Sequence, residues 1–241
     1  MLFNLISAKT LFLSLAIGLV GCMSPIYAQD ATQVKESDEE EYVTHKLRFV
    51  EFSIDRIIPI QTFKSSIITN LWSGNLRYLV QLSKEKLDFI GLEINYTQIA
   101  NDSNVFSDSE VQTSSNFVGA FFTFRHFPNL YFWRIEPFAE LAIGPQFFYT
   151  QTTTSFFDVD STNDVAFDEV DTGVAYAAGV GFMLHITGQV FLTTQVNYFG
   201  GTSVTYLVKR DDQFAFPLDN FRPETSQTNY IKLQFGISVS I

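Results

Sequence analysis

Apolar and polar side chains alternate along most of the chain after residue 43. The alternation is clearest at residues 230–241, where the apolar positions from Ile231 to Ile241 are separated by single polar or small residues. Successive side chains of a β-strand point to opposite faces, so this segment predicts a strand with one apolar face and one polar face. Such a strand fits the closing strand of a membrane β-barrel, and it also fits the last strand of a soluble sandwich.

The same alternation recurs in eight segments that are long enough to be strands. In the first segment the pattern breaks at Phe49-Val50, where a β-bulge would restore it. The segments lie at about 44–57, 74–83, 86–100, 114–127, 134–151, 172–186, 189–206 and 230–241.

The connections between these segments alternate in length. Those at 83–85, 127–133 and 187–189 are short, whereas those around 58–73, 101–113, 152–171 and 207–226 are long and mostly polar. Short turns at one end and long loops at the other are typical of an outer-membrane barrel. A soluble lipocalin also has eight up-and-down strands, but its outer face is charged. Here the face opposite the apolar one is small and polar, which favours a narrow lumen.

Two segments resemble a known family. Residues 136–146, Glu-Pro-Phe-Ala-Glu-Leu-Ala-Ile-Gly-Pro-Gln, look like the recurring P-[FY]-A-E-x-x-x-G strand of the small outer-membrane β-barrel proteins with eight strands, of the OmpA-like and OmpW-like kind. Residues 172–181 look like the glycine-rich strand that follows it. The resemblance covers about 44–241. It implies an all-β, antiparallel up-and-down transmembrane barrel in the bacterial outer membrane, and it specifies no activity.

The N-terminal residues predict export. Residues 1–28 have a positive Lys9 and an apolar run at 11–20, as a secretory signal does. Cleavage after Ala28 is one interpretation. The alternative is a lipoprotein signal of residues 1–21, in which Cys22 of the sequence Leu-Val-Gly-Cys is lipidated. An acidic, disordered lead-in at 29–43 then precedes a barrel domain at 44–241. Cys22 is the only cysteine, so the mature barrel has no disulfide.

Composition narrows the range of partners. The formal charge of −11 argues against nucleic acid, and the acidic residues cluster at 36–41 and at 158–171. The chain has 26 Phe and 10 Tyr. We expect rings near strand ends to form girdles at the headgroup level, and Phe156, Phe157 and Phe167 in the acidic loop to fold onto the barrel rim or to contact a partner. The expected girdle residues are Tyr131, Phe132, Trp133, Tyr149, Tyr198 and Tyr206.

If the apolar faces meet lipid, several charged side chains point into the lumen. An eight-stranded barrel is just wide enough for side chains to fill its interior, and buried charges must pair there. A salt-bridged plug is therefore expected, and a gated ion path is the alternative. The residues of this predicted network are Arg77, Glu93, Arg125, Glu140, His185 and Lys232, with Glu51 as a further member.

The sequence contains few signals for chemistry. No histidine lies in a zinc or hydrolase arrangement, and the acidic stretch 158–164 lacks the glycine and the glutamate of a calcium loop. We expect no catalytic residue, cofactor or metal. The predicted function is a structural or surface-interaction role through the long acidic loops. A narrow channel, a lipid-modifying enzyme and a periplasmic lipocalin-like carrier are the alternatives. The expected partners of a monomer are outer-membrane lipid, lipopolysaccharide and an extracellular partner at the loops.

Overall fold

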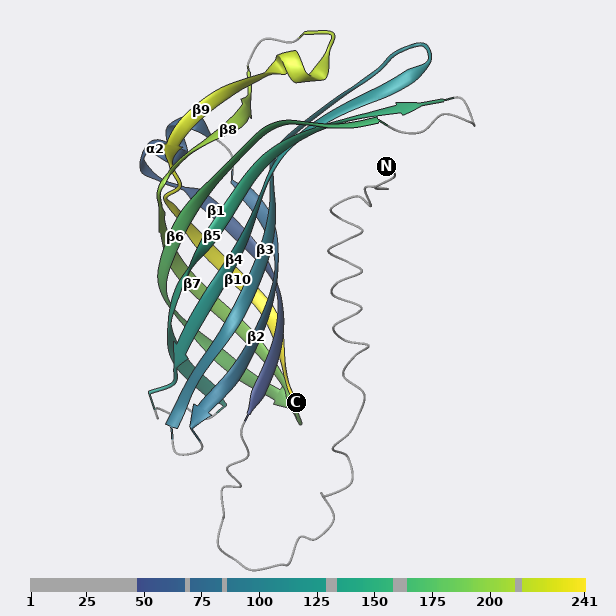
Figure 1. Cartoon of the computed structure of the whole chain (residues 1–241). Coiled ribbons are helices and arrows are strands. Elements are labelled where there is room, and N and C mark those ends of the chain that lie inside the picture. The colour runs from purple at the N-terminus through teal and green to yellow at the C-terminus, as the bar shows by residue number, and fades with distance from the viewer. Residues whose placement is uncertain (1–46, 68–69, 84–85, 129–133, 158–163, 211–213) are drawn as a thin grey trace, which may run out of the picture. The chain divides into compact units, whose positions relative to one another are not determined.

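A computed structural model describes residues 47–67, 70–83, 86–128, 134–157, 164–210 and 214–241. Eight antiparallel strands form a closed barrel in the ring order β1-β2-β3-β4-β5-β6-β7-β10, and β10 closes onto β1 (Figure 1). This confirms the predicted up-and-down barrel. The strands are β1 (Arg48–Pro59), β2 (Leu71–Ser83), β3 (Lys86–Val105), β4 (Ser109–His126), β5 (Ile135–Phe156), β6 (Asp164–Thr187), β7 (Val190–Gly201) and β10 (Tyr230–Ser240).

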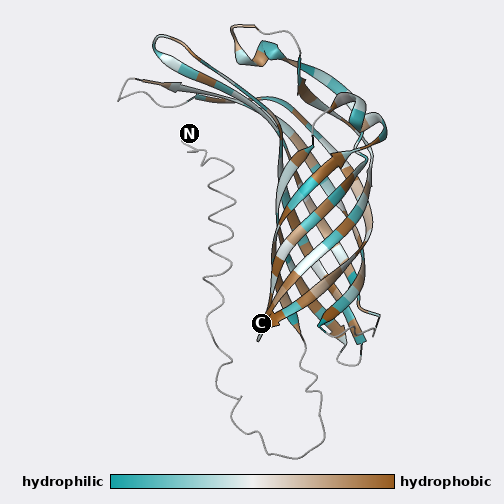
Figure 2. Ribbon diagram, turned by 180° about the vertical axis from the view of Figure 1, so that it is seen from behind, coloured by the Kyte–Doolittle hydropathy of each residue, from teal (hydrophilic) through white to brown (hydrophobic). Residues whose placement is uncertain are grey.

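The barrel wall is apolar on the outside, and the polar and charged side chains of its strands point inward. In β10, Phe235 and Ile237 are 64% and 52% exposed, whereas Lys232, Gln234 and Ser238 on the opposite face of the strand are fully buried. Figure 2 shows the resulting alternation of apolar and polar residues along the strands of the wall. A continuous apolar exterior of this kind is stable in lipid and not in water. The chain is therefore a transmembrane barrel, and the soluble sandwich and lipocalin alternatives, which need the apolar face as a core, are wrong.

In the part of the chain that the structure describes, one helix, one two-stranded sheet and one 3-10 helix are separate from the strands of this ring. The short helix α2 (Gln61–Ser66) follows β1, and a separate two-stranded sheet pairs β8 (Ser203–Lys209) with β9 (Phe221–Gln227). The 3-10 helix η1 (Pro217–Asn220) lies between β8 and β9. Among the described residues, no helix has the length and apolar character needed to cross a membrane.

The long connections are more ordered than the sequence pattern predicted. The segments expected as loops at 101–113 and 152–171 are largely continuations of β3, β4, β5 and β6. The predicted strand at 189–206 ends at Gly201, and β8 then leaves the barrel to pair with β9. Strands with water on both faces need no apolar alternation, so the pattern that identifies the barrel strands does not identify these.

The predicted bulge at Phe49-Val50 is wrong. β1 pairs without a register shift with both β2 and β10, Phe49 is buried in the lumen, and Val50 faces outward. The aromatic side chain of Phe49 thus breaks the polar pattern without altering the backbone. Register shifts occur instead next to Ser83, Ala100, Gln151 and Thr187.

Candidate functional site

Arg77 on β2 lies at the centre of a charged layer inside the barrel. Its Nη1 donates to Oε1 of Glu51 at 2.5 Å, and its Nη2 donates to Oε2 of Glu93 at 2.5 Å. The same Nη2 lies 3.1 Å from Oε1 of Glu140. These carboxylates come from β1, β3 and β5, and the four side chains are almost fully buried. The planar guanidinium, with five N–H donors, therefore joins strands from different parts of the ring.

Arg125 and Lys232 complete the layer. Arg125 on β4 contacts Oε2 of Glu140 at 2.8 Å and Oε2 of Glu51 at 3.1 Å. Lys232 on β10 contacts Oε1 of Glu93 at 2.5 Å and lies 3.6 Å from Oδ2 of Asp55. The amides of Gln195 and Gln234 and the hydroxyl of Ser238 donate further hydrogen bonds to Glu140 and Glu51. Three cations and four carboxylates from six strands thus form one network.

Of the residues expected in the lumen network, five of six meet there, together with Glu51. His185 lies elsewhere: it is exposed at the turn between β6 and β7, its Nε2 is 2.9 Å from the carbonyl oxygen of Gly188, and its ring stacks on Phe191. His185 is on the inward-pointing side of β6, but it lies beyond the end of the packed lumen. Asp55 belongs to the network and was missed, although its spacing of two and four residues from Ser53 and Glu51 on one strand could have indicated it.

Aromatic side chains fill the lumen on both sides of the charged layer, which the small and polar inner face inferred from the sequence did not predict. Towards the turns lies a cluster built around Phe49, Phe89, Phe127 and Phe138, with Leu79 and Met183. Towards the long loops lies a larger cluster. There Phe199 stacks on Tyr230 at 4.7 Å and Phe117 stacks on Phe148 at 5.1 Å. The described lumen therefore consists of an apolar layer, a charged layer and a second apolar layer.

The second apolar layer extends into the elements outside the ring. Phe63 of α2 and Tyr206 of β8 are buried and meet edge to face at 5.6 Å, and Tyr206 also packs against Phe148 at 5.7 Å. The hydroxyl of Tyr206 bonds to Oγ of Ser226 at 2.7 Å. Helix α2 and the β8–β9 hairpin thus cover the barrel mouth. The expectation that Tyr206 belongs to a lipid-facing girdle is wrong, because β8 leaves the wall before this residue.

The other expected girdle residues are placed in part. Tyr149 and Tyr198 occupy outward positions on β5 and β7. Residues 131–133, which include the expected Tyr131, Phe132 and Trp133, lie outside the described residues, as do residues 1–46 with the predicted signal and acidic lead-in.

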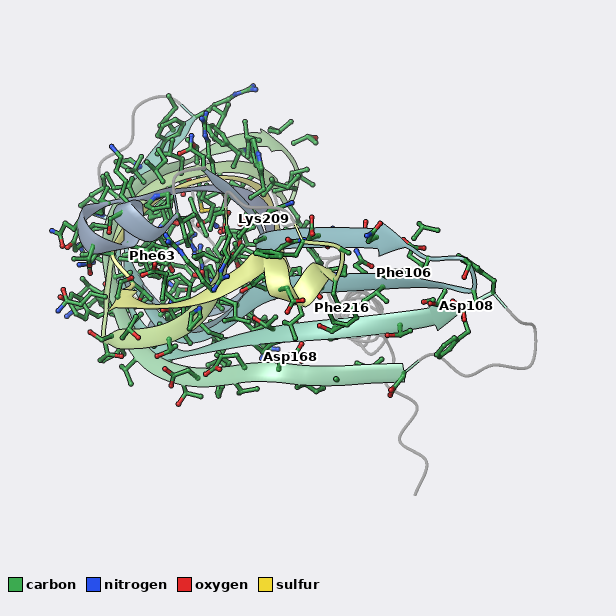
Figure 3. The ribbon with its side chains drawn as sticks, turned by 90° about the horizontal axis from the view of Figure 1, so that it is seen from above. Phe63, Phe106, Asp108, Asp168, Lys209 and Phe216 are labelled. Atoms are coloured by element: carbon green, nitrogen blue, oxygen red, sulfur yellow. The ribbon has the colours of Figure 1, made fainter. Side chains whose placement is uncertain are left out.

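Beyond the ring, four strands continue as one sheet, which we call the blade. It comprises residues 98–105 of β3, 109–116 of β4, 149–156 of β5 and 164–172 of β6. These residues remain paired across β3-β4-β5-β6, outside the pairings of β3 with β2 and of β6 with β7. Viewed from above, the blade projects to one side of the barrel, with Phe106 and Asp108 at its tip (Figure 3).

The β8–β9 hairpin is fastened to the inner face of the blade. Nζ of Lys209 donates to Oδ1 of Asp102 at 2.5 Å, and Nδ2 of Asn220 donates to Oδ2 of the same residue at 2.6 Å. Partial burial would raise the pKa of Asp102, but these hydrogen bonds and the charge of Lys209 outweigh it and hold the pKa below its ordinary value. Nδ2 of Asn104 also donates to the carbonyl oxygen of Ala215 at 2.6 Å.

The arrangement offers little for catalysis. His126 Nδ1 lies 2.6 Å from Oδ1 of Asp88, and both residues are near the turn end of the barrel. Among the described residues no group of three or more His, Cys, Asp or Glu side chains is placed to hold a metal ion. Most of the acidic stretch weighed as a calcium loop, residues 158–163, lies outside the described residues.

No model of a known protein family matches the chain, and no curated protein matches it. Solved structures are similar in backbone path only. Neisserial surface protein A has a TM-score of 0.42 at 9% identity, over 80% of this chain and 96% of that one. Outer membrane protein OprG from Pseudomonas aeruginosa has a TM-score of 0.41 at 11% identity, over 81% of this chain and 96% of that one. A major outer membrane protein from Thermus thermophilus has a TM-score of 0.40 at 10% identity, over 80% of this chain and 99% of that one.

The assignment of the chain depends on its own geometry. The ring is closed, its wall is apolar on the outside, and its interior is filled by a buried charged layer between two apolar layers. With these three properties, the chain has the fold of a small eight-stranded transmembrane β-barrel protein.

Proposed function

We propose that this chain is a non-enzymatic protein of the cell surface, in which a sealed barrel holds the blade in position for contact with an extracellular partner. The observation that carries the proposal is the continuity of β3, β4, β5 and β6 from the wall into the blade. Because the same strands form the wall and the blade, backbone pairing connects the blade directly to the barrel. A protruding sheet that is connected in this way is suited to presenting a binding surface.

The packing of the lumen favours a barrel that anchors the blade over a barrel that conducts ions. Buried rings lie on both sides of the charged layer, and α2 and the β8–β9 hairpin cover one end. An ion would have to displace these rings and separate buried ion pairs such as Arg125–Glu140. We expect no reproducible conductance in a planar bilayer. Stable single-channel steps that change on Arg125→Ala or Glu140→Gln would favour the channel alternative instead.

The free edge of the blade is the surface that we propose for the partner. Residues Asp164 to Val170 of β6 pair with β5 on one side and, within the described residues, with no strand on the other. Such an edge can accept an added strand through its backbone N–H and C=O groups. The edge carries Asp164, Asp168 and Glu169, so the fitting partner is an extended segment rich in Lys or Arg.

A labelled peptide of alternating Lys and Val residues is a suitable probe, because it pairs as a strand and carries positive charge. We expect cells that display the wild-type protein to bind it in a salt-sensitive manner. Binding should be lost when Asp164 and Asp168 become Asn and Glu169 becomes Gln. The matched control is Glu110→Gln, which removes an exposed carboxylate from the opposite face of the blade. Equal binding by the triple variant, or equal loss in the control, would contradict the proposed edge.

The lipid-modifying enzyme stays an alternative with its own test. Expression of the chain would change the acylation of lipid A, and a single His or Ser substitution would abolish the change. We expect lipid A to be unaltered.

A further inference from the structure

The two faces of the blade differ in chemistry. The inner face continues the lumen side of the strands, and the outer face continues the lipid-facing wall. Acidic side chains gather on the inner face or at its edge, where Asp168 accepts a hydrogen bond from Oγ1 of Thr152 at 2.6 Å and Asp102 binds Lys209. The outer face carries a single carboxylate, Glu110, and none of its described residues is Lys or Arg.

Over β3, β4 and β5 the outer face is mainly an array of amides and hydroxyls, interrupted by Val105 and Tyr149, whereas its β6 positions Val165, Phe167 and Val170 are apolar. Its cross-strand rows run from Ser103 through Gln112 and Thr153 to Val165, and from Asn101 through Ser114 and Gln151 to Phe167. Neighbouring positions are about 4.8 Å apart across the strands and about 6.8 Å apart along them. Gln112 donates to Asn101 at 3.2 Å, and Gln151 donates to Thr153 at 3.2 Å, so these side chains support one another.

The direction of the blade determines what this face meets. Figure 1 shows the strands bending away from the barrel axis above the ring, and in Figure 3 η1 lies over the blade when it is seen from above. Helix η1 contacts β3 and β4, where it covers the inner face. The inner face therefore turns away from the membrane. The outer face is the underside of an overhang and turns towards the outer leaflet beside the barrel.

We propose that this underside binds the saccharide portion of the lipopolysaccharide that surrounds the barrel. Amides and hydroxyls both donate and accept hydrogen bonds, as sugar hydroxyls do, and neither bears a charge. Phe167, which is 51% exposed and has its ring centroid 6.1 Å from that of Tyr149, adds an apolar surface on the same face for the C–H face of a sugar ring.

Other occupants of the space below the overhang fit less well. Lipid phosphates are recognised by Lys or Arg side chains, and the described residues of the underside include neither. Hydrocarbon would leave a polar array without partners, which is costly. The proposal is independent of the partner at the β6 edge, because it concerns the opposite face and a different chemistry.

Thiol labelling on the two faces tests the proposal. Gln112→Cys places a thiol on the underside and Ala166→Cys places one on the upper face, both at exposed positions. Each variant is made with Cys22→Ser, so that the introduced thiol is the only one. Each protein is reconstituted in phospholipid vesicles that contain no lipopolysaccharide, lipid A alone, or lipopolysaccharide with its core sugars, and the rate of reaction with a bulky maleimide is measured.

The core sugars should slow labelling of Gln112→Cys by roughly tenfold, equivalent to about 1.4 kcal/mol of contact, and leave Ala166→Cys unchanged. An unchanged rate at Gln112→Cys overturns the proposal. Equal slowing at both positions also overturns it, since that is crowding and not binding. Protection that is already complete with phospholipid or lipid A alone overturns it in favour of the bilayer itself.

A second measurement needs no substitution. Delipidated core oligosaccharide is titrated into the wild-type protein in detergent while amide chemical shifts are recorded. We expect shifts in the blade that include Asn101, Gln112, Gln151 and Thr153. Shifts that are absent, or that are confined to the β8–β9 hairpin, would contradict the inference.

Discussion

Replacing Arg77 by methionine removes the cation that joins three carboxylates inside the barrel. Each carboxylate keeps another cation: Glu51 keeps Arg125 at 3.1 Å, Glu140 keeps Arg125 at 2.8 Å, and Glu93 keeps Lys232 at 2.5 Å. Breaking a buried ion pair by removing one partner costs about 3–5 kcal/mol. Because no carboxylate is left without a cation, we expect the lower end, about 3 kcal/mol, which reduces the ratio of folded to unfolded protein by roughly 150-fold.

The assay is urea unfolding of the barrel in lipid vesicles, followed by the fluorescence of its two tryptophans, Trp72 and Trp133. The matched control is Arg222→Met on the β8–β9 hairpin. Arg222 pairs with Glu224 at 3.2 Å, but the two side chains are 53% and 31% exposed. An exposed pair contributes less than about 1 kcal/mol, so the control should unfold close to the wild-type urea concentration.

Arg77→Lys separates charge from geometry. The lysine retains the positive charge but lacks the planar fork that reaches several carboxylates together, so its stability should fall between those of the wild type and Arg77→Met. The reasoning is refuted if Arg77→Met unfolds at the wild-type urea concentration, because the charged layer would then contribute nothing to stability. It is also refuted if Arg222→Met costs as much as Arg77→Met.

Three further predictions concern the wall and the hairpin. Gly144→Ala places a Cβ against the backbone carbonyl oxygen of Ala120, closer than van der Waals contact allows, so we expect about 1–3 kcal/mol of destabilisation and a lower yield of heat-modifiable barrel on gels. Tyr206→Ala should speed protease cleavage within the β8–β9 hairpin while the barrel band stays intact, because the lost ring fastens the hairpin to the lumen aromatics. The pKa of Asp102 is lowered in the folded protein, so its hydrogen bond to Lys209 stabilises the hairpin fully at pH values above the ordinary pKa of 3.8 and is lost as the pH falls through the lower pKa of the folded state. Amide hydrogen exchange of the hairpin should therefore become faster on acidification. Asp102→Asn should remove this dependence of the exchange rate on pH.

The sequence identifies the barrel because a membrane wall imposes a strict rule on it. A strand between lipid and lumen must alternate with a period of two, and Leu76, Arg77 and Tyr78 show the rule in three residues. The same rule indicates that Arg77, Glu93, Arg125, Glu140 and Lys232 point inward. It fails for His185, because alternation gives the face of a residue but not its depth along the axis.

The tertiary structure alone decides which inward charges meet. Glu51 and Arg77 are directly paired across β1 and β2, but Glu93 and Lys232 are 139 residues apart and come together only through ring closure and register. The aromatic layers also depend on depth, since Phe49 interrupts the polar face without bending the strand. The blade and the β8–β9 hairpin were missed for a related reason. Outside the membrane both faces of a sheet meet water, so the apolar alternation that determines the wall is absent, and backbone pairing with neighbouring strands is what orders these residues.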